Sequence, residues 1–238
     1  MNSDSNSHQN VPAVEAAGLG RRFGRIWALA HVDLTVQAGE SMLLAGSNGS
    51  GKTTLLRLIA GLHKATAGTL NIFGRDQRQH MLACRKDMSL VSHHSFLYDR
   101  LTAYENLRVA ARLMGKSAGR EELVPLLESV GLGDRADTLT AGFSAGMRKR
   151  MLLLRAHLED PRIVMLDEPF AALDIAGRSL VEDWVHQFRA EGRTVLIASH
   201  IVERAAPLCD RGVLLERGQI IWRGEAADLP ERMHRGQE

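Results

Sequence analysis

The chain has 238 residues, of which 45% are hydrophobic and 24% are charged, and its formal net charge is +2. This is the balance of a globular α/β domain, without the strong positive charge that is typical of nucleic-acid binding. The cysteines Cys84 and Cys209 stand far apart, so neither a disulfide framework nor a cysteine-ligated metal site is expected. Apolar runs are strand-sized and residues 1–9 are polar, so we expect no membrane span and no signal peptide.

The first part of the chain favours strands followed by one helix. Residues 1–12 are expected to form a disordered tail. Apolar runs within 11–19 and 26–36 predict an antiparallel strand pair, and 41–45 predicts a buried strand. A helix is expected over 52–61, ended by Gly61, and two further strands over 69–72 and 88–91.

From about residue 101 to 158 the pattern becomes helical. Thr102 and Glu105 form a capping-box pattern, and apolar residues recur at helical spacing over 123–130. Beyond this lobe we expect a strand over 162–166, a helix over 177–190, a strand over 194–198 and a strand pair over 211–223, followed by a tail over 225–238. Alternating strands and helices predict a largely parallel sheet that is covered on both faces and binds ligands beyond the carboxyl ends of its strands.

A complete phosphate-binding loop follows the 41–45 strand. Its sequence matches GxxxxGK[ST] between an apolar strand and a helix. Glycines let the backbone N–H groups approach phosphate oxygens, and the helix adds the positive end of its dipole. Lys52 should reach the β- and γ-phosphates, and the Thr53 hydroxyl should bind Mg²⁺. The expected nucleotide-binding residues are Gly46, Ser47, Asn48, Gly49, Ser50, Gly51, Lys52, Thr53 and Thr54.

Two carboxylates end a second apolar strand, at Asp167 and Glu168. A strand-end carboxylate next to a phosphate loop can bind Mg²⁺, a role that Asp167 fits. Glu168 is expected to point elsewhere and to act as a general base on an attacking water. An apolar strand followed by Asp-Glu also describes an ordinary solvated strand end, and it is the phosphate loop upstream that favours the catalytic interpretation.

The segment 143–147, Phe-Ser-Ala-Gly-Met, resembles the LSGGQ signature of ABC ATPases. The expected signature residues are Ser144, Ala145 and Gly146, although the segment alone also fits a Ser-capped helix. The segment 171–174 resembles the D-loop that ends in Asp174, and His200 stands at the family's switch-histidine position. Phe23 matches the aromatic residue that stacks on adenine.

The resemblance to ABC ATPases implies a P-loop NTPase fold over residues 13–224. This fold has a RecA-like core, an antiparallel β subdomain and an inserted helical subdomain. It implies an ATPase that uses ATP and Mg²⁺, with Lys52, Glu168 and His200 as catalytic residues. The implied partners are a second copy of the chain, with the signature acting in trans, and an integral membrane permease at the cytoplasmic face of the membrane. No nucleic-acid partner is implied.

One departure from the family pattern suggests a subfamily. His93 stands where the family has a glutamine that couples the nucleotide site to the permease. Together with the segment 167–170, it resembles the ATP-binding subunit of the haem exporter of cytochrome c biogenesis. The alternatives are the ATPase of another export system, for drugs, lipids or polysaccharides, or a soluble ABC ATPase that acts on ribosomes or DNA. The signature, D-loop and switch-histidine matches argue against a non-ABC P-loop kinase. The presence of Lys52 and Glu168 argues against a degenerate site without activity.

Overall fold

The computed structural model describes residues 11–92, 97–171 and 173–235. The strands are β1 (Val14–Phe23), β2 (Ile26–Val36), β3 (Ser41–Ala45), β4 (Ala67–Ile72), β5 (Arg75–Asp76), β6 (Met88–Val91), β7 (Ile163–Asp167), β8 (Thr194–Ser199), β9 (Arg211–Glu216) and β10 (Gln219–Glu225). The helices are α1 (Lys52–Ile59), α2 (Met81–Lys86), α3 (Ala103–Leu113), α4 (Arg120–Ser129), α5 (Ala145–Glu159), α6 (Ile175–Ala190), α7 (Val202–Ala205) and α8 (Leu229–Arg235). Short 3-10 turns are η1 (Gly133–Arg135), η2 (Thr140–Gly142), η3 (Ala206–Leu208) and η4 (Ala226–Asp228).

The strands form two sheets. One is antiparallel, in the order β2-β1-β4-β5, and the other follows the order β10-β9-β3-β8-β7-β6. In the second sheet the neighbours from β9 to β6 are parallel, and only β10 runs antiparallel at one edge. Because β3, β7 and β8 are neighbours or next-neighbours and run in the same direction, the residues that follow each of them meet at one edge of the sheet.

The larger sheet divides two hydrophobic cores. Leu43, Val164 and Ile197 face a core that contains α5, α6 and the helical lobe. Their neighbours in the chain, such as Leu44 and Met165, face the other core, with α1 and the antiparallel sheet. All five residues of β3 are buried, as expected for a strand covered on both faces.

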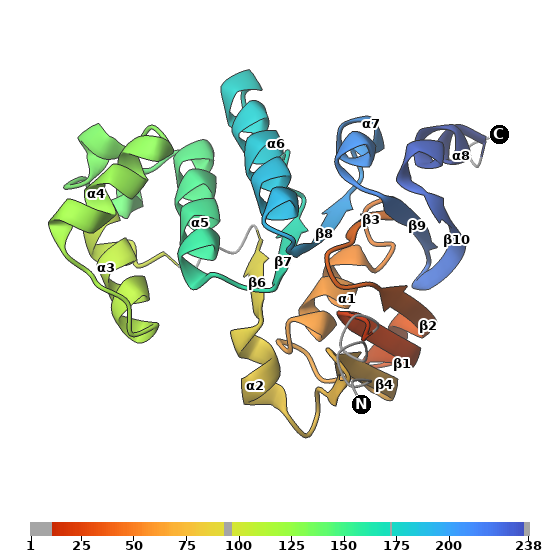
Figure 1. Ribbon diagram of the computed structural model, residues 1–238. Helices are drawn as coiled ribbons and strands as arrows, with labels where there is room; N and C mark the ends of the chain where they lie inside the picture. The colour runs from red at the N-terminus through yellow and green to blue at the C-terminus, as the bar shows by residue number, and fades with distance from the viewer. Residues whose placement is uncertain (1–10, 93–96, 172, 236–238) are drawn as a thin grey trace, which may run out of the picture.

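The helical lobe projects to one side of the sheet (Figure 1). Thr102 caps α3 by accepting a hydrogen bond from the backbone N–H of Glu105, whose carboxylate accepts one from the N–H of Thr102. Helices α3, α4 and α5 pack on one another around Leu107, Leu123 and Leu127. The lobe connects to the sheet through β6 on one side and β7 on the other.

The structure confirms the predicted fold class, with the antiparallel sheet, the parallel core and the helical lobe all present. Several elements differ from the sequence expectation. Helix α2 was not predicted, and the C-terminal tail expected from residue 225 contains α8, anchored by the buried Leu229. Helix α6 begins two residues earlier than expected, because Asp174 caps it. Among the described residues, no helix combines the length and the apolar character needed to cross a bilayer.

Candidate active site

The phosphate loop lies between the end of β3 and the start of α1, where its glycines adopt conformations that other residues rarely take. Gly46 has φ 146° and Gly51 has φ 112°. A Cβ at Gly51 would lie 2.8 Å from the carbonyl oxygen of Ala28 and 2.7 Å from Leu29 Cδ2. A Cβ at Gly49, by contrast, would meet open space. The loop is therefore packed tightly on its inner side and open where a phosphate would lie.

Lys52 is the first residue of α1 and is 5% exposed. Its Nζ donates hydrogen bonds to the carbonyl oxygens of Gly46 (2.7 Å) and Ser47 (3.0 Å), so it lies under the loop. No acidic side chain stands in the first turn of α1, which leaves the positive end of the helix dipole available to an anion. The hydroxyl of Ser50 is buried, has no hydrogen-bond partner among the residues that the structure describes, and offers a further donor.

Thr53 and Asp167 meet across the site. The Thr53 hydroxyl donates a 2.9 Å hydrogen bond to Oδ1 of Asp167, at the end of β7. A hydroxyl and a carboxylate are the hard oxygen ligands that Mg²⁺ uses next to phosphates. These two residues fit a Mg²⁺ ion, and Thr54 is half-buried in the same first turn of α1.

Glu168 is in contact with both the phosphate-loop lysine and His200. Its Oε1 lies 3.5 Å from Lys52 Nζ, and its Oε2 lies 2.8 Å from His200 Nδ1. His200 follows β8, and its backbone N–H also donates to Oε2, at 3.3 Å. A carboxylate held between a lysine and an exposed histidine can accept a proton from a water at the phosphate end of the sheet.

Phe23 ends β1 and is 44% exposed. Its ring contacts His63 edge-to-face, with centroids 5.5 Å apart, and the Arg21 guanidinium lies 4.5 Å from its centroid. The β1–β2 hairpin lies beside the phosphate loop, because Ala28 of β2 approaches Gly51. An exposed aromatic ring at this place can stack on a flat base. The adenine-stacking role of Phe23 itself stays a prediction.

The signature and D-loop residues lie together on another exposed surface. Ser144 caps α5, and its Oγ accepts a 3.2 Å hydrogen bond from the N–H of Met147. Ser144 and Ala145 are exposed, and a Cβ at Gly146 would lie 3.6 Å from Leu173, next to Asp174. Asp174 accepts a 2.8 Å hydrogen bond from the N–H of Gly177 and thereby caps α6. The Ser cap is therefore present and the start of α5 is exposed, while the role of this segment as a signature that acts in trans stays a prediction.

His93 lies outside the described residues, so its predicted coupling role stays a prediction. One residue that the sequence patterns did not single out is Lys149. Its side chain is 6% exposed and lies under the turn that contains Glu168. The signal was present, since Lys149 shares an i, i+4, i+7 stripe with the buried Leu153 and Ala156.

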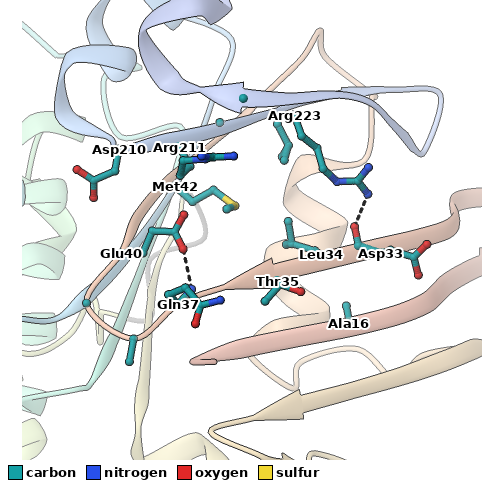
Figure 2. A pocket seen from close by; sticks show the side chains of 15 residues that line it. Ala16, Asp33, Leu34, Thr35, Gln37, Glu40, Met42, Asp210, Arg211 and Arg223 are labelled. Carbon is teal, nitrogen blue, oxygen red and sulfur yellow. Dashed lines mark hydrogen bonds between the residues drawn. The ribbon is translucent and has the colours of Figure 1, made fainter. Parts of the chain in front are cut away.

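A separate hollow of about 810 Å³ lies at the opposite end of β3. Asp33, Glu40 and Arg223 line it, and the Arg223 guanidinium donates a hydrogen bond to the carbonyl oxygen of Asp33 (Figure 2). Ligands of parallel sheets bind at the carboxyl ends of the strands, whereas this hollow adjoins the start of β3. We therefore expect the nucleotide at the phosphate-loop end.

Comparisons with known proteins agree with this geometry. The ABC transporter family matches residues 29–171. The chain is 35% identical over 209 residues to the ABC transporter ATP-binding protein NatA of Bacillus subtilis, covering 86% of this chain and 84% of that protein. It is also 35% identical to the Nod factor export ATP-binding protein I of Rhizobium johnstonii, covering 97% and 75%. A solved dimeric ATP-binding cassette in a post-hydrolysis state, bound to ADP and Pi, superposes with a TM-score of 0.79 at 25% identity, covering 90% and 98%.

The chain belongs to the ABC transporter family. It is an ATP-binding, ATP-hydrolysing subunit that uses Mg²⁺.

Replacing Thr53 with Val should lower the rate of ATP hydrolysis about tenfold or more and raise the Mg²⁺ concentration needed for half-maximal rate. Valine has nearly the same shape but lacks the hydroxyl that meets Asp167. Titrating Mg²⁺ at saturating ATP measures both effects. Thr69→Val, at an exposed position on β4, is the matched control. An unchanged Mg²⁺ requirement in Thr53→Val would contradict the metal role.

Proposed function

We propose that two copies of this chain close around two Mg-ATP molecules and that hydrolysis reopens the pair, which drives a separate membrane permease. The proposal rests mainly on one observation, that the phosphate loop and the signature are both exposed to solvent. Ser47, Asn48 and Gly49 are exposed at the rim of the loop, and so are Ser144 and Ala145 at the start of α5. A second chain can therefore reach the phosphates from the open side.

The start of α5 suits a phosphate of the partner. No acidic side chain stands in its first turn, so the N–H groups and the dipole are not neutralised locally. Beside it, Ile175 follows Asp174 and is 80% exposed. An exposed isoleucine next to the cap of α6 favours a surface that is covered in a complex. The solved dimeric cassette bound to ADP and Pi supports the proposal that such chains pair.

In this proposal the γ-phosphate holds the dimer closed. Lys52 of one copy and Ser144 with Gly146 of the other contact it, so ATP completes the interface. Glu168 acts as the general base, and His200 orients the water and the carboxylate, at the 2.8 Å contact described above. Loss of the γ-phosphate removes the shared ligand, and the copies separate.

The permease would dock on the groove between the parallel core and the helical lobe. This hollow of about 690 Å³ is lined by apolar side chains that include Leu90, Met114 and Leu152, and its charged lining includes Arg85, Lys86 and Glu159. Its walls come from both parts of the fold, so a shift of the lobe would change its shape. We propose a short amphipathic helix of the permease as the occupant, with acidic groups facing the basic side chains, and a position of the chain at the cytoplasmic face of the membrane.

The identity of the transported cargo is a separate and more specific proposal. The haem exporter remains our sequence-based proposal, carried by His93 and the segment 167–170. The names of the relatives, which include Nod factor export, support the alternative that the chain serves the export of another cargo. Identification of the permease separates the two.

The test is affinity capture of tagged Glu168→Gln protein with Mg-ATP from detergent-solubilised cells, because slow hydrolysis should prolong the closed state. We expect a multi-span membrane protein in the eluate, which mass spectrometry identifies. A parallel capture with Lys52→Ala, which should not close, shows which proteins depend on ATP. Recovery of ribosomal proteins or DNA-bound factors in place of a permease would contradict the transport role and leave the ATPase assignment standing.

A further inference from the structure

Lys149 is a buried cation inside the fold. It lies on α5, five residues after the signature serine, and is 6% exposed. Burying an ammonium group is unfavourable unless hydrogen bonds replace its water shell. Within the part of the chain that the structure describes, the hydrogen bonds of Lys149 Nζ all go to backbone carbonyl oxygens. These oxygens belong to one turn.

Three carbonyl groups of this turn converge on the ammonium. Lys149 Nζ donates to the oxygens of Glu168 (2.8 Å), Pro169 (2.8 Å) and Ala171 (3.4 Å). The carbonyl of Glu168 also accepts a hydrogen bond from the N–H of Ala171, at 3.3 Å, which closes the turn. The three carbonyl oxygens of the turn thus point at the ammonium group of Lys149.

Glu168 needs this support because its backbone is strained. Its φ is +49°, a left-handed conformation that costs a non-glycine residue about 1 kcal/mol or more. In that conformation its side chain reaches both Lys52 and His200. A hydrogen bond to the carbonyl of Glu168 itself therefore helps to fix where its carboxylate lies.

The neighbouring Arg148 ties the start of α5 to the segments that precede α3 and α5. Arg148 donates to Asp99 Oδ1 at 2.8 Å and to the carbonyl oxygen of Ala141 at 3.3 Å. Arg148 and Lys149 are consecutive. The first turn of α5 is therefore bonded through Arg148 to Asp99, before α3, and through Lys149 to the turn that contains Glu168. A displacement of α5 changes both contacts together.

We propose that Lys149 is a positioning residue that sets the carboxylate of Glu168 and couples its placement to the signature helix of the same chain. The inference deepens the proposed function and rests on the base role of Glu168 given there. When the partner's ATP binds the signature, α5 is held, and Lys149 holds the turn of Glu168 in the geometry suited to water attack.

The charge state of Lys149 fits this task. Burial lowers the pKa of its ammonium to about 8, while the nearby carboxylates of Glu168 and Asp167 oppose that change. At pH 7 the group is therefore mostly protonated and donates to all three carbonyls.

The experiment compares Lys149→Met with Arg150→Met in steady-state ATPase assays. Arg150 is the next residue on α5 and donates to the carbonyl oxygen of Val130, away from the Glu168 turn. We expect Lys149→Met to lower kcat about tenfold while the KM for ATP changes less than about twofold, because misplacement affects the reacting geometry and spares binding. Arg150→Met should keep kcat within about twofold. Lys149→Gln, whose amide can donate two hydrogen bonds, should recover part of the rate.

The double variant Glu168→Gln/Lys149→Met distinguishes positioning from a general loss of structure. If Lys149 acts through Glu168, the double variant keeps the residual rate of Glu168→Gln, since the target of the positioning is already gone. Multiplied losses in the double variant, or equal losses in Lys149→Met and Arg150→Met, would overturn the inference. Normal turnover of Glu168→Gln alone would instead overturn the proposed base role, and the inference with it. Should Lys149→Met fail to fold, Lys149→Gln in the same two backgrounds gives the same decision.

Discussion

Replacing Glu168 with Gln should lower the rate of ATP hydrolysis at least about a hundredfold while Mg-ATP still binds. The amide keeps the shape of the side chain but cannot accept a proton from water, and loss of a general base typically costs two to four orders of magnitude. It also removes the negative charge between Lys52 Nζ and His200 Nδ1. Phosphate release under single-turnover conditions measures the chemical step.

The same variant should accumulate ATP-dependent dimers, which light scattering detects. The γ-phosphate persists in it, so the proposed shared ligand of the two copies is not removed. Glu203→Gln, at an exposed position on α7 shortly after His200, is the matched control and should hydrolyse ATP normally. If Glu168→Gln stays monomeric at saturating ATP, the sandwich dimer is wrong, whatever its hydrolysis rate.

The fold was predictable where burial leaves a strong local pattern. The runs over β3 and β7 are apolar at consecutive positions because the larger sheet is covered on both faces, and the structure buries every residue of both strands. The capping box at Thr102 is a local signal, and it marks the start of α3 as expected. The strand order of the sheet was not accessible, since it depends on contacts far apart in the chain.

The missed elements are those that tertiary contacts stabilise. Helix α2 has six residues and one buried side chain, Cys84, while Leu82 is 78% exposed. Such a segment has no apolar stripe to detect. Helix α8 depends on Leu229, whose side chain packs against Gly212 of β9, a partner that the sequence does not reveal.

The features of the candidate site also fall into those that the sequence predicts and those that depend on tertiary contacts. The motif residues follow strands or open helices, so parallel topology alone brings Lys52, Asp167 and Glu168 to one edge. The left-handed backbone of Glu168 and the lysine beneath its turn could not be predicted, because both depend on how α5 packs against the end of β7. A charged residue on an otherwise buried helical stripe is the pattern that would have drawn attention to Lys149.

Replacing Lys52 with Ala should abolish measurable ATP hydrolysis and weaken ATP binding. Lys52 is a buried cation, and it already lies under the phosphate loop through its bonds to Gly46 and Ser47. Loss of one preorganised donor to a developing charge typically lowers a rate by a factor of about 10²–10³. Here the same change also leaves the carboxylate of Glu168 without its nearby positive charge. Steady-state hydrolysis and equilibrium binding of a fluorescent ATP analogue measure the two effects.

Lys64→Ala, at an exposed position beyond α1, provides the control for the loss of a positive charge in this region. It should hydrolyse ATP at the rate of the unaltered chain, which would show that the fixed position of Lys52 matters and that overall charge does not. The thermal unfolding midpoint of Lys52→Ala should stay close to that of the unaltered chain without nucleotide. It should rise less on addition of Mg-ATP, because the stabilisation by a ligand grows with the ratio of its free concentration to its dissociation constant. Near-normal turnover in Lys52→Ala would place the phosphates elsewhere and would remove the basis for every catalytic role proposed for this edge of the sheet.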